Sequence, residues 1–137
     1  MPSVLPDLDV VYFDRRHLSS EHDEKFPLAL LRREPQFPWE VTNQAAVHLW
    51  FETTFGHAVD PIESIEEAIA SWPETATSVG IRLENDQLRI IAPLGLSDLF
   101  GMVVRRNPRR ASVETYQERI RTKKYAERWP KVRILPV

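Results

Sequence analysis

The chain has 137 residues, 42% of them hydrophobic, a size typical of one domain with a substantial apolar core. It contains no cysteine, which excludes disulfides, zinc–thiolate sites and a cysteine nucleophile. Its net charge of −2 hides a division: residues 1–100 hold 7 Lys or Arg against 17 Asp or Glu, and residues 101–137 hold 11 against 3. The acidic part could bind a metal ion while the basic end binds a polyanion. Alternatively, the charges of the two parts could neutralise each other.

The sequence carries no signal for export or membrane insertion. No apolar run approaches the roughly 20 residues that a membrane-spanning helix requires. Residues 1–7 lack the basic and apolar regions of a signal peptide. We therefore expect a cytoplasmic protein without a membrane partner.

The first half of the chain predicts two strands and two helices. β-branched and aromatic residues dominate residues 8–13, and because both faces of this strand are largely apolar, we expect it to be central in its sheet. Residues 19–33 are typical of a helix, although Pro27 leaves open a loop in their first half. Residues 37–41 predict a second strand, and residues 44–55 predict a helix that ends at the following glycine.

The second half begins with a helix and a hairpin. Residues 64–67, Ser-Ile-Glu-Glu, form a capping box that opens a helix, and Pro73 ends it. Residues 79–83 and 88–92 alternate between apolar and polar side chains around an Asn-Asp turn, which predicts a β-hairpin.

The remaining residues predict two helices and a strand. A short helix starts at Ser97, Ser112 caps the last helix, and residues 132–135 favour a final strand. The order of strands and helices is mixed along the chain. We therefore predict an α+β fold, with a mixed sheet and flanking helices.

Asp7 and Asp9 are the sharpest chemical feature of the sequence. Residues i and i+2 of a strand point to the same face, about 6.6 Å apart along the chain. Two carboxylates so placed can converge on Mg²⁺, which prefers oxygen ligands and substrate phosphates, and two such ions about 3.5–4 Å apart can activate one oxygen and stabilise another. Because Asp-x-Asp pairs are also common at solvated strand ends, the pair alone does not establish a metal site.

Glu40 strengthens the case for a carboxylate site. It lies between Trp39 and Val41 in the second predicted strand, so its side chain can face the same cleft as the two aspartates. It would be a third metal ligand, or the base that takes a proton from an acceptor hydroxyl. The alternative is a solvent-exposed glutamate on a half-buried strand.

Six linked motifs run in order along nearly the whole chain, at residues 7–14, 39–44, 48–50, 72–82, 92–100 and 128–130. Together they resemble a bacterial nucleotidyltransferase-like family, first described as a domain of unknown function and grouped with the DNA polymerase β nucleotidyltransferase superfamily. The resemblance implies a single nucleotidyltransferase-like domain over residues 1–137. It would use Mg²⁺ (or Mn²⁺) to transfer a nucleoside monophosphate from an NTP to an unknown hydroxyl acceptor.

The superfamily pattern is a Gly-Ser turn, then Asp-x-Asp, then a third acid on a later strand. By resemblance, Asp7 and Asp9 hold the metal and Glu40 completes the catalytic set. Residues 1–6 contain no glycine. We therefore expect an N-terminally truncated domain without the Gly-Ser element that closes the triphosphate pocket, either because the gene start is placed too late or because the protein has lost that element. This departure leaves open a catalytically inactive nucleotide-, RNA- or partner-binding module, and an uncovered apolar strand edge would favour a homo-oligomer.

Five further residues are weaker candidates for binding the nucleotide. Asn43 and Gln44 would contact its ribose or base, or Asn43 would cap the following helix. Thr75 and Thr77 would line the cleft, or would make turn hydrogen bonds. Arg82 would pair with a phosphate, or would form a surface ion pair.

The histidines and the basic end are less informative. His48, among apolar residues, is typical of a structural histidine with satisfied hydrogen bonds, and His17, His22 and His57 show no metal-ligand spacing. The basic end would hold an RNA backbone or would pair with nearby acids. Because few aromatic residues accompany it, we expect a small-molecule acceptor rather than RNA.

Overall fold

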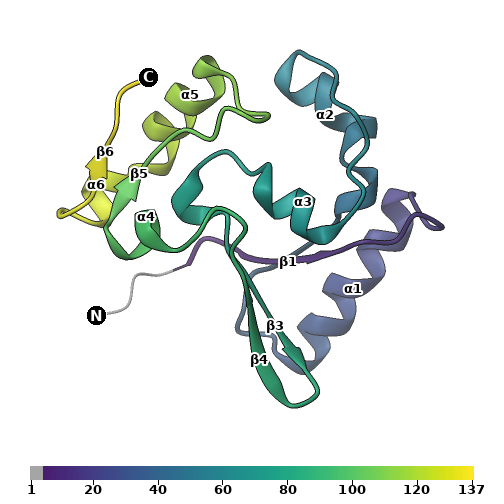
Figure 1. Ribbon diagram of the computed structural model, residues 1–137. Coiled ribbons are helices and arrows are strands. Elements are labelled where there is room, and N and C mark those ends of the chain that lie inside the picture. The colour runs from purple at the N-terminus through teal and green to yellow at the C-terminus, as the bar shows by residue number, and fades with distance from the viewer. Residues whose placement is uncertain (1–4) are drawn as a thin grey trace. The chain divides into compact units, whose positions relative to one another are not determined.

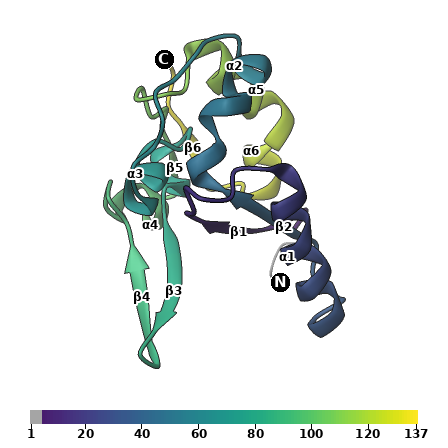
Figure 2. The same ribbon diagram turned by 90° about the vertical axis from the view of Figure 1, so that its right-hand side faces the viewer.

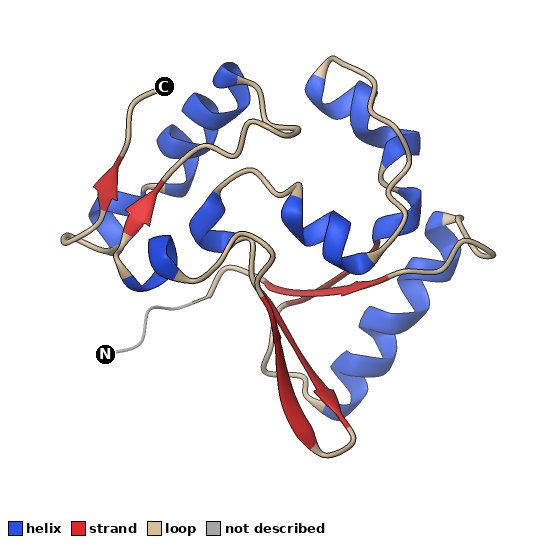
Figure 3. Cartoon of the chain, viewed as in Figure 1, coloured by secondary structure: helices blue, strands red, loops and turns tan. Residues whose placement is uncertain are grey.

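The computed structural model describes residues 5–137, and the chain divides into two compact units, residues 1–65 and 66–137. Both units combine helices with strands (Figure 3), so the predicted α+β class is confirmed. The strands among the described residues form three two-stranded ladders. No helix in residues 5–137 is both long enough and apolar enough to cross a bilayer. The assignment of a single domain stays a prediction.

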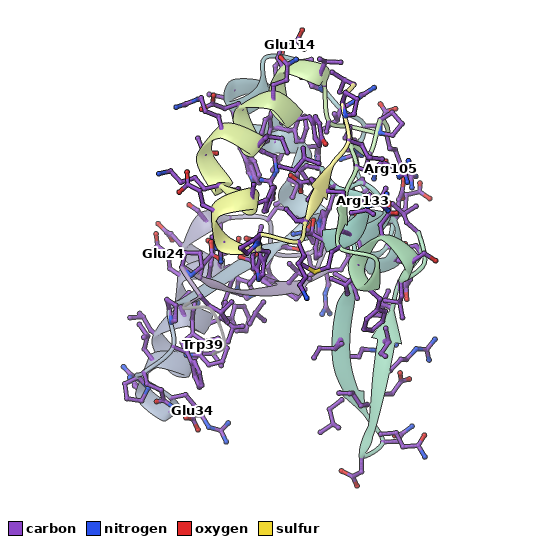
Figure 4. The ribbon with its side chains drawn as sticks, turned by 90° about the vertical axis from the view of Figure 1, so that its left-hand side faces the viewer. Glu24, Glu34, Trp39, Arg105, Glu114 and Arg133 are labelled. Atoms are coloured by element: carbon purple, nitrogen blue, oxygen red, sulfur yellow. The ribbon has the colours of Figure 1, made fainter. Side chains whose placement is uncertain are left out.

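The first unit is built on a parallel β–α–β arrangement. Strand β1 (Leu8–Tyr12) pairs in parallel with β2 (Trp39–Asn43), and helix α1 (Ser20–Arg33) connects them and packs against β2 (Figures 1 and 2). The helix continues through Pro27, so the loop left open for its first half is not formed. Just after the C-terminal end of α1, the Trp39 indole N–H donates to the backbone carbonyl of Glu34 at 2.9 Å (Figure 4).

Strand β1 does not occupy the central position predicted for it. Within residues 5–137 it pairs with β2 alone. Its last residue, Tyr12, contacts α1: the Tyr12 ring lies 4.9 Å from that of Phe26, and the Tyr12 hydroxyl donates to Asp23. Burial, then this hydrogen bond, raises the pKa of Tyr12 above its usual range. The second edge of β1 pairs with no other strand in the described part of the chain.

The predicted helix over residues 44–55 is divided in two. A 3₁₀ turn, η1 (Gln44–Ala46), precedes helix α2 (His48–Phe55). The helix ends at Gly56, whose φ of 81° is the left-handed conformation that favours glycine at this position.

The second unit contains the predicted hairpin. After helix α3 (Ile65–Ala70) and the 3₁₀ turn η2 (Thr75–Thr77), strands β3 (Gly80–Glu84) and β4 (Gln87–Ile91) pair antiparallel. Asn85 and Asp86 have φ values of 51° and 60°, as a type I′ turn requires.

A small hydrophobic core closes the second unit. It is made by Val104, Tyr116 and Tyr125. The elements around it are α4 (Ser97–Phe100), β5 (Val103–Val104), α5 (Val113–Lys123), α6 (Tyr125–Arg128) and β6 (Arg133–Ile134), with β5 and β6 parallel. As predicted, Ser112 caps α5, accepting a hydrogen bond from the Thr115 N–H at 3.1 Å.

Candidate active site and metal centres

Strand pairing brings the three predicted carboxylates together. Asp9 lies directly opposite Glu40 in the parallel register of β1 and β2, and Asp7 stands two residues before Asp9. All three side chains therefore share one face of the ladder. One carboxylate oxygen from each lies within 4.8 Å of the other two, and Asp9 and Glu40 are exposed to solvent.

The dimensions of this carboxylate cluster suit a hard divalent cation. Mg²⁺ binds oxygen at about 2.0–2.1 Å, so two of its ligands lie at most roughly 4.2 Å apart. The three carboxylate oxygens, each within 4.8 Å of the other two, would have to move closer together to share one such ion. The donor set, oxygen alone and open to solvent, fits an ion that retains water and shares its coordination with phosphate.

Asn43 is the last residue of strand β2, Gln44 comes directly after it, and both side chains are buried. The Asn43 side-chain oxygen accepts from the N–H groups of Ala45 (3.1 Å) and Asp14 (3.0 Å), and its amide donates to the carbonyls of Asp14 (2.8 Å) and His17 (2.9 Å). Asn43 is 1% exposed and Gln44 is also buried. The capping role considered for Asn43 is thus present, and it also fixes the loop after β1.

The other candidates for nucleotide binding lie in the second unit. The Thr75 hydroxyl donates to Asp98, and the Thr77 hydroxyl donates to Glu74 at 3.2 Å. Arg82 forms an ion pair with Glu84 at 3.0 Å on the exposed hairpin. The ion pair considered for Arg82 and the local hydrogen bonds considered for Thr75 and Thr77 are therefore all present.

A second cluster of ligand atoms, missed in the sequence, lies after β1. Asp14, His17 and His22 each offer a ligand atom within 4.8 Å of the other two. The interpretation that His17 and His22 have no metal-ligand arrangement is therefore wrong. The signal was the spacing Asp-x2-His-x4-His, which runs from the end of a strand into the first turn of a helix. The His17 hydrogen bond holds the pKa of the Asp14 carboxyl at about 2.

The first unit also contains a cavity of about 340 Å³. Its lining residues are Arg15, Leu18, Ala45, His48, Pro61, Ile62 and Glu63. The buried Nδ1 of His48 has no hydrogen-bond partner in the described part of the chain. The described residues therefore do not supply at Nδ1 the hydrogen bond expected of a structural histidine.

The second unit buries a charged pair that the sequence did not predict. Glu74, 1% exposed, accepts from Arg119 Nε at 2.6 Å, from its guanidinium NH2 at 3.0 Å and from the Tyr125 hydroxyl at 3.1 Å. Burial, then the charge of Glu74, raises the pKa of Tyr125 to about 12. The carboxylate of Glu74 thus holds the Arg119 side chain inward, although Arg119 lies on α5 among other basic residues.

Two comparisons with known proteins find similarity over nearly the whole chain. The sequence model of a family described as Nucleotidyltransferase matches residues 1–134. A solved NMR structure, described as revealing a CCA-adding enzyme head domain, is similar to this chain with a TM-score of 0.76 and 28% sequence identity, covering 96% of this chain and 68% of that chain. A search among curated proteins gave no match.

Proposed function

We propose, because the chain belongs to the nucleotidyltransferase family, that it transfers a nucleoside monophosphate from an NTP to a hydroxyl acceptor and releases pyrophosphate. The observation that carries this proposal is the register that sets Asp9 opposite Glu40, with Asp7 on the same face. Catalysis of this kind depends mainly on positioning and on electrostatic stabilisation of phosphate charge.

Asp7 and Asp9 would hold Mg²⁺ or Mn²⁺. When bound, such an ion supplies positive charge to the phosphates and lowers the cost of developing negative charge. Glu40 would either share the ion with the aspartates or accept the proton of the acceptor hydroxyl. Its exposure and its place beside Asp9 support both roles, since an acceptor can reach it from solvent.

The proposal depends on the three carboxylates rather than on the weaker candidates for nucleotide binding. The side chains of Asn43, Thr75 and Arg82 already make hydrogen bonds within the protein. Any of these that contacts a nucleotide would have to exchange a hydrogen bond for the new one, which reduces the net gain. The Thr77 hydroxyl likewise already donates to Glu74. Gln44 and Thr77 remain candidates for contacting the nucleotide.

Charge pairing in the second unit supports a small-molecule acceptor. Several of its basic side chains pair with acids of the same unit: Arg105 with Asp98, Arg109 with Glu67, Arg119 with Glu74, Arg121 with Glu118, and Lys124 with Glu127. Each pairing lowers the net charge available to attract a phosphate backbone. We therefore propose that the acceptor is a small molecule rather than RNA.

The direct test is transfer from an NTP labelled at the α-phosphate, with Mg²⁺, to two cellular fractions: small metabolites and purified RNA. We expect label to appear in a small-molecule product, with one NTP preferred. Calorimetric titration with each NTP and Mg²⁺ should give heat that disappears when the metal is chelated. Absence of both nucleotide binding and label transfer would contradict the proposed function.

The preference for a small molecule makes a separate prediction about RNA. We expect generic RNA to bind only weakly at low and moderate salt, and charge reversal by Lys123→Glu and Lys124→Glu to change that binding little. The measurement is fluorescence anisotropy of a labelled RNA across a salt series. Salt-sensitive binding at micromolar concentrations (an order-of-magnitude figure for nonspecific contacts) that the reversal abolishes would indicate an RNA acceptor instead.

A further inference from the structure

The second cluster of ligand atoms lies in the first unit, at the end of β1 opposite to the carboxylate cluster. We propose that Asp14, His17 and His22 form a site for a zinc-type divalent ion, separate from the carboxylate cluster at the start of the strand. The proposal does not depend on nucleotidyl transfer, because the ligands and the chemistry differ.

The three side chains are close enough to share one ion. His17 Nδ1 lies 2.8 Å from Asp14 Oδ2, and the rings of His17 and His22 are stacked with centroids 4.6 Å apart. Zinc ligands stand about 2.0–2.1 Å from the metal in a tetrahedral arrangement, which places them roughly 3.3 Å from one another. Because all three ligand atoms lie within 4.8 Å of one another, the longest separation has to shorten by at most about 1.5 Å.

The backbone of the first two ligands, Asp14 and His17, is hydrogen-bonded to Asn43. The buried Asn43 amide donates to the carbonyls of both Asp14 and His17, and its oxygen accepts the Asp14 N–H. Asp14 Oδ1 in turn accepts the Arg16 N–H at 2.8 Å. A hydrogen bond to a ligand side chain, such as that from Arg16 to Asp14, orients the ligand and increases metal affinity.

The third ligand is positioned by aromatic packing. The His22 ring meets the Phe26 ring edge-on at 5.4 Å and lies 6.3 Å from the Tyr12 ring. These contacts keep His22, in the first turn of α1, on the side of the loop where Asp14 and His17 lie. An ion bound there would tie the end of β1 to the start of α1.

The donor set distinguishes this site from the carboxylate cluster. Two imidazoles and one carboxylate suit borderline ions such as Zn²⁺, whereas oxygen alone suits Mg²⁺. The positions also differ, because five residues of extended chain from Asp9 to Asp14 span about 16 Å. That separation is far larger than the roughly 3.5–4 Å between the ions of a two-metal catalytic site. Three protein ligands would leave a fourth position for water or an exogenous ligand.

The test is calorimetric titration of the full metal-free chain with Zn²⁺ alone, without nucleotide. We expect one ion to bind per chain, and His17→Gln or His22→Gln to raise the Kd by at least about tenfold, since even indirect partners of a metal contribute that much. His57→Gln is the matched control, because His57 belongs to the same unit and packs on Phe51 instead. It should bind Zn²⁺ like the unmodified chain.

Two further measurements separate this site from the alternatives. The double variant Asp7→Asn, Asp9→Asn should keep its Zn²⁺ affinity, and loss of binding there would place the ion in the carboxylate cluster and overturn the proposal. In NMR spectra of the unmodified chain, Zn²⁺ should shift the imidazole resonances of His17 and His22 and leave that of His57 in place. The proposal would also be overturned if the His17→Gln and His22→Gln chains bound Zn²⁺ as tightly as the unmodified chain, or if the unmodified chain bound no Zn²⁺.

Discussion

An Asp9→Asn chain is expected to lose nucleotidyl transfer by about a hundredfold to a thousandfold, the effect of removing one group that stabilises developing charge. The amide keeps the size of the side chain but removes the negative charge that the proposed ion needs. Because Asp9 is exposed and lies at the strand ladder's open face, the fold should tolerate the change. The measurement is the initial rate of label transfer at saturating Mg²⁺, together with the urea midpoint of unfolding.

Asp86→Asn is the matched control for this variant. Asp86 lies in the exposed turn of the hairpin and takes no part in the carboxylate cluster. The same chemical change there should leave the transfer rate within about twofold, consistent with the small effects of surface substitutions. Equal activity of the Asp9→Asn chain and the unmodified chain would remove the metal role assigned to Asp9 and would favour a non-catalytic binding module.

Local sequence patterns predicted the elements that local chemistry determines. The hairpin was predicted because Asn85 and Asp86 accept positive φ at the turn between two alternating strands, and the structure has them at 51° and 60°. The start of α5 was predicted because a serine hydroxyl can accept an N–H three residues on, as Ser112 does. These interactions lie within a few residues, so the sequence contains all the information they need.

The carboxylate cluster was predicted from the alternation of side chains along a strand. This alternation puts Asp7 and Asp9 on the same face. Glu40 lies between two apolar residues, so its side chain was assigned to the polar face of its strand. The structure adds the register that sets Asp9 opposite Glu40. The paired residues are 31 positions apart in the sequence (40 − 9), so the register depends on how two distant segments pack together.

Two sets of hydrogen bonds that the sequence analysis missed span long separations. The Asn43 amide reaches the carbonyls of Asp14 and His17, 29 and 26 residues away, and thereby fixes the second ligand cluster. The Arg119 guanidinium reaches Glu74 across 45 residues. On a helical pattern alone, Arg119 looks like Arg121, two residues further on, although only one of them meets a buried acid. The difference between these two arginines can be measured.

An Arg119→Met chain is expected to be less stable by about 3–5 kcal/mol, the cost of removing one partner from a buried ion pair. Glu74 is 1% exposed, so without Arg119 its charge would keep only the Tyr125 and Thr77 hydroxyls as side-chain hydrogen-bond donors among those described above. Domains of this size are stable by roughly 5–15 kcal/mol, so the loss would be a large fraction of the total. The measurement is the shift of the urea midpoint at an unchanged slope.

Arg121→Met makes the matched comparison on the same helix. Arg121 pairs with Glu118 at 2.6 Å, as close as Arg119 is to Glu74, but the two side chains are 72% and 59% exposed. Water screens such a pair, so its loss should change stability by about 0–1 kcal/mol. A double variant Glu74→Gln, Arg119→Met should recover part of the loss, because the uncompensated charge is gone. If both single arginine variants lowered the midpoint equally, burial of Glu74 would not be the cause, and the pair would contribute no more than a surface contact.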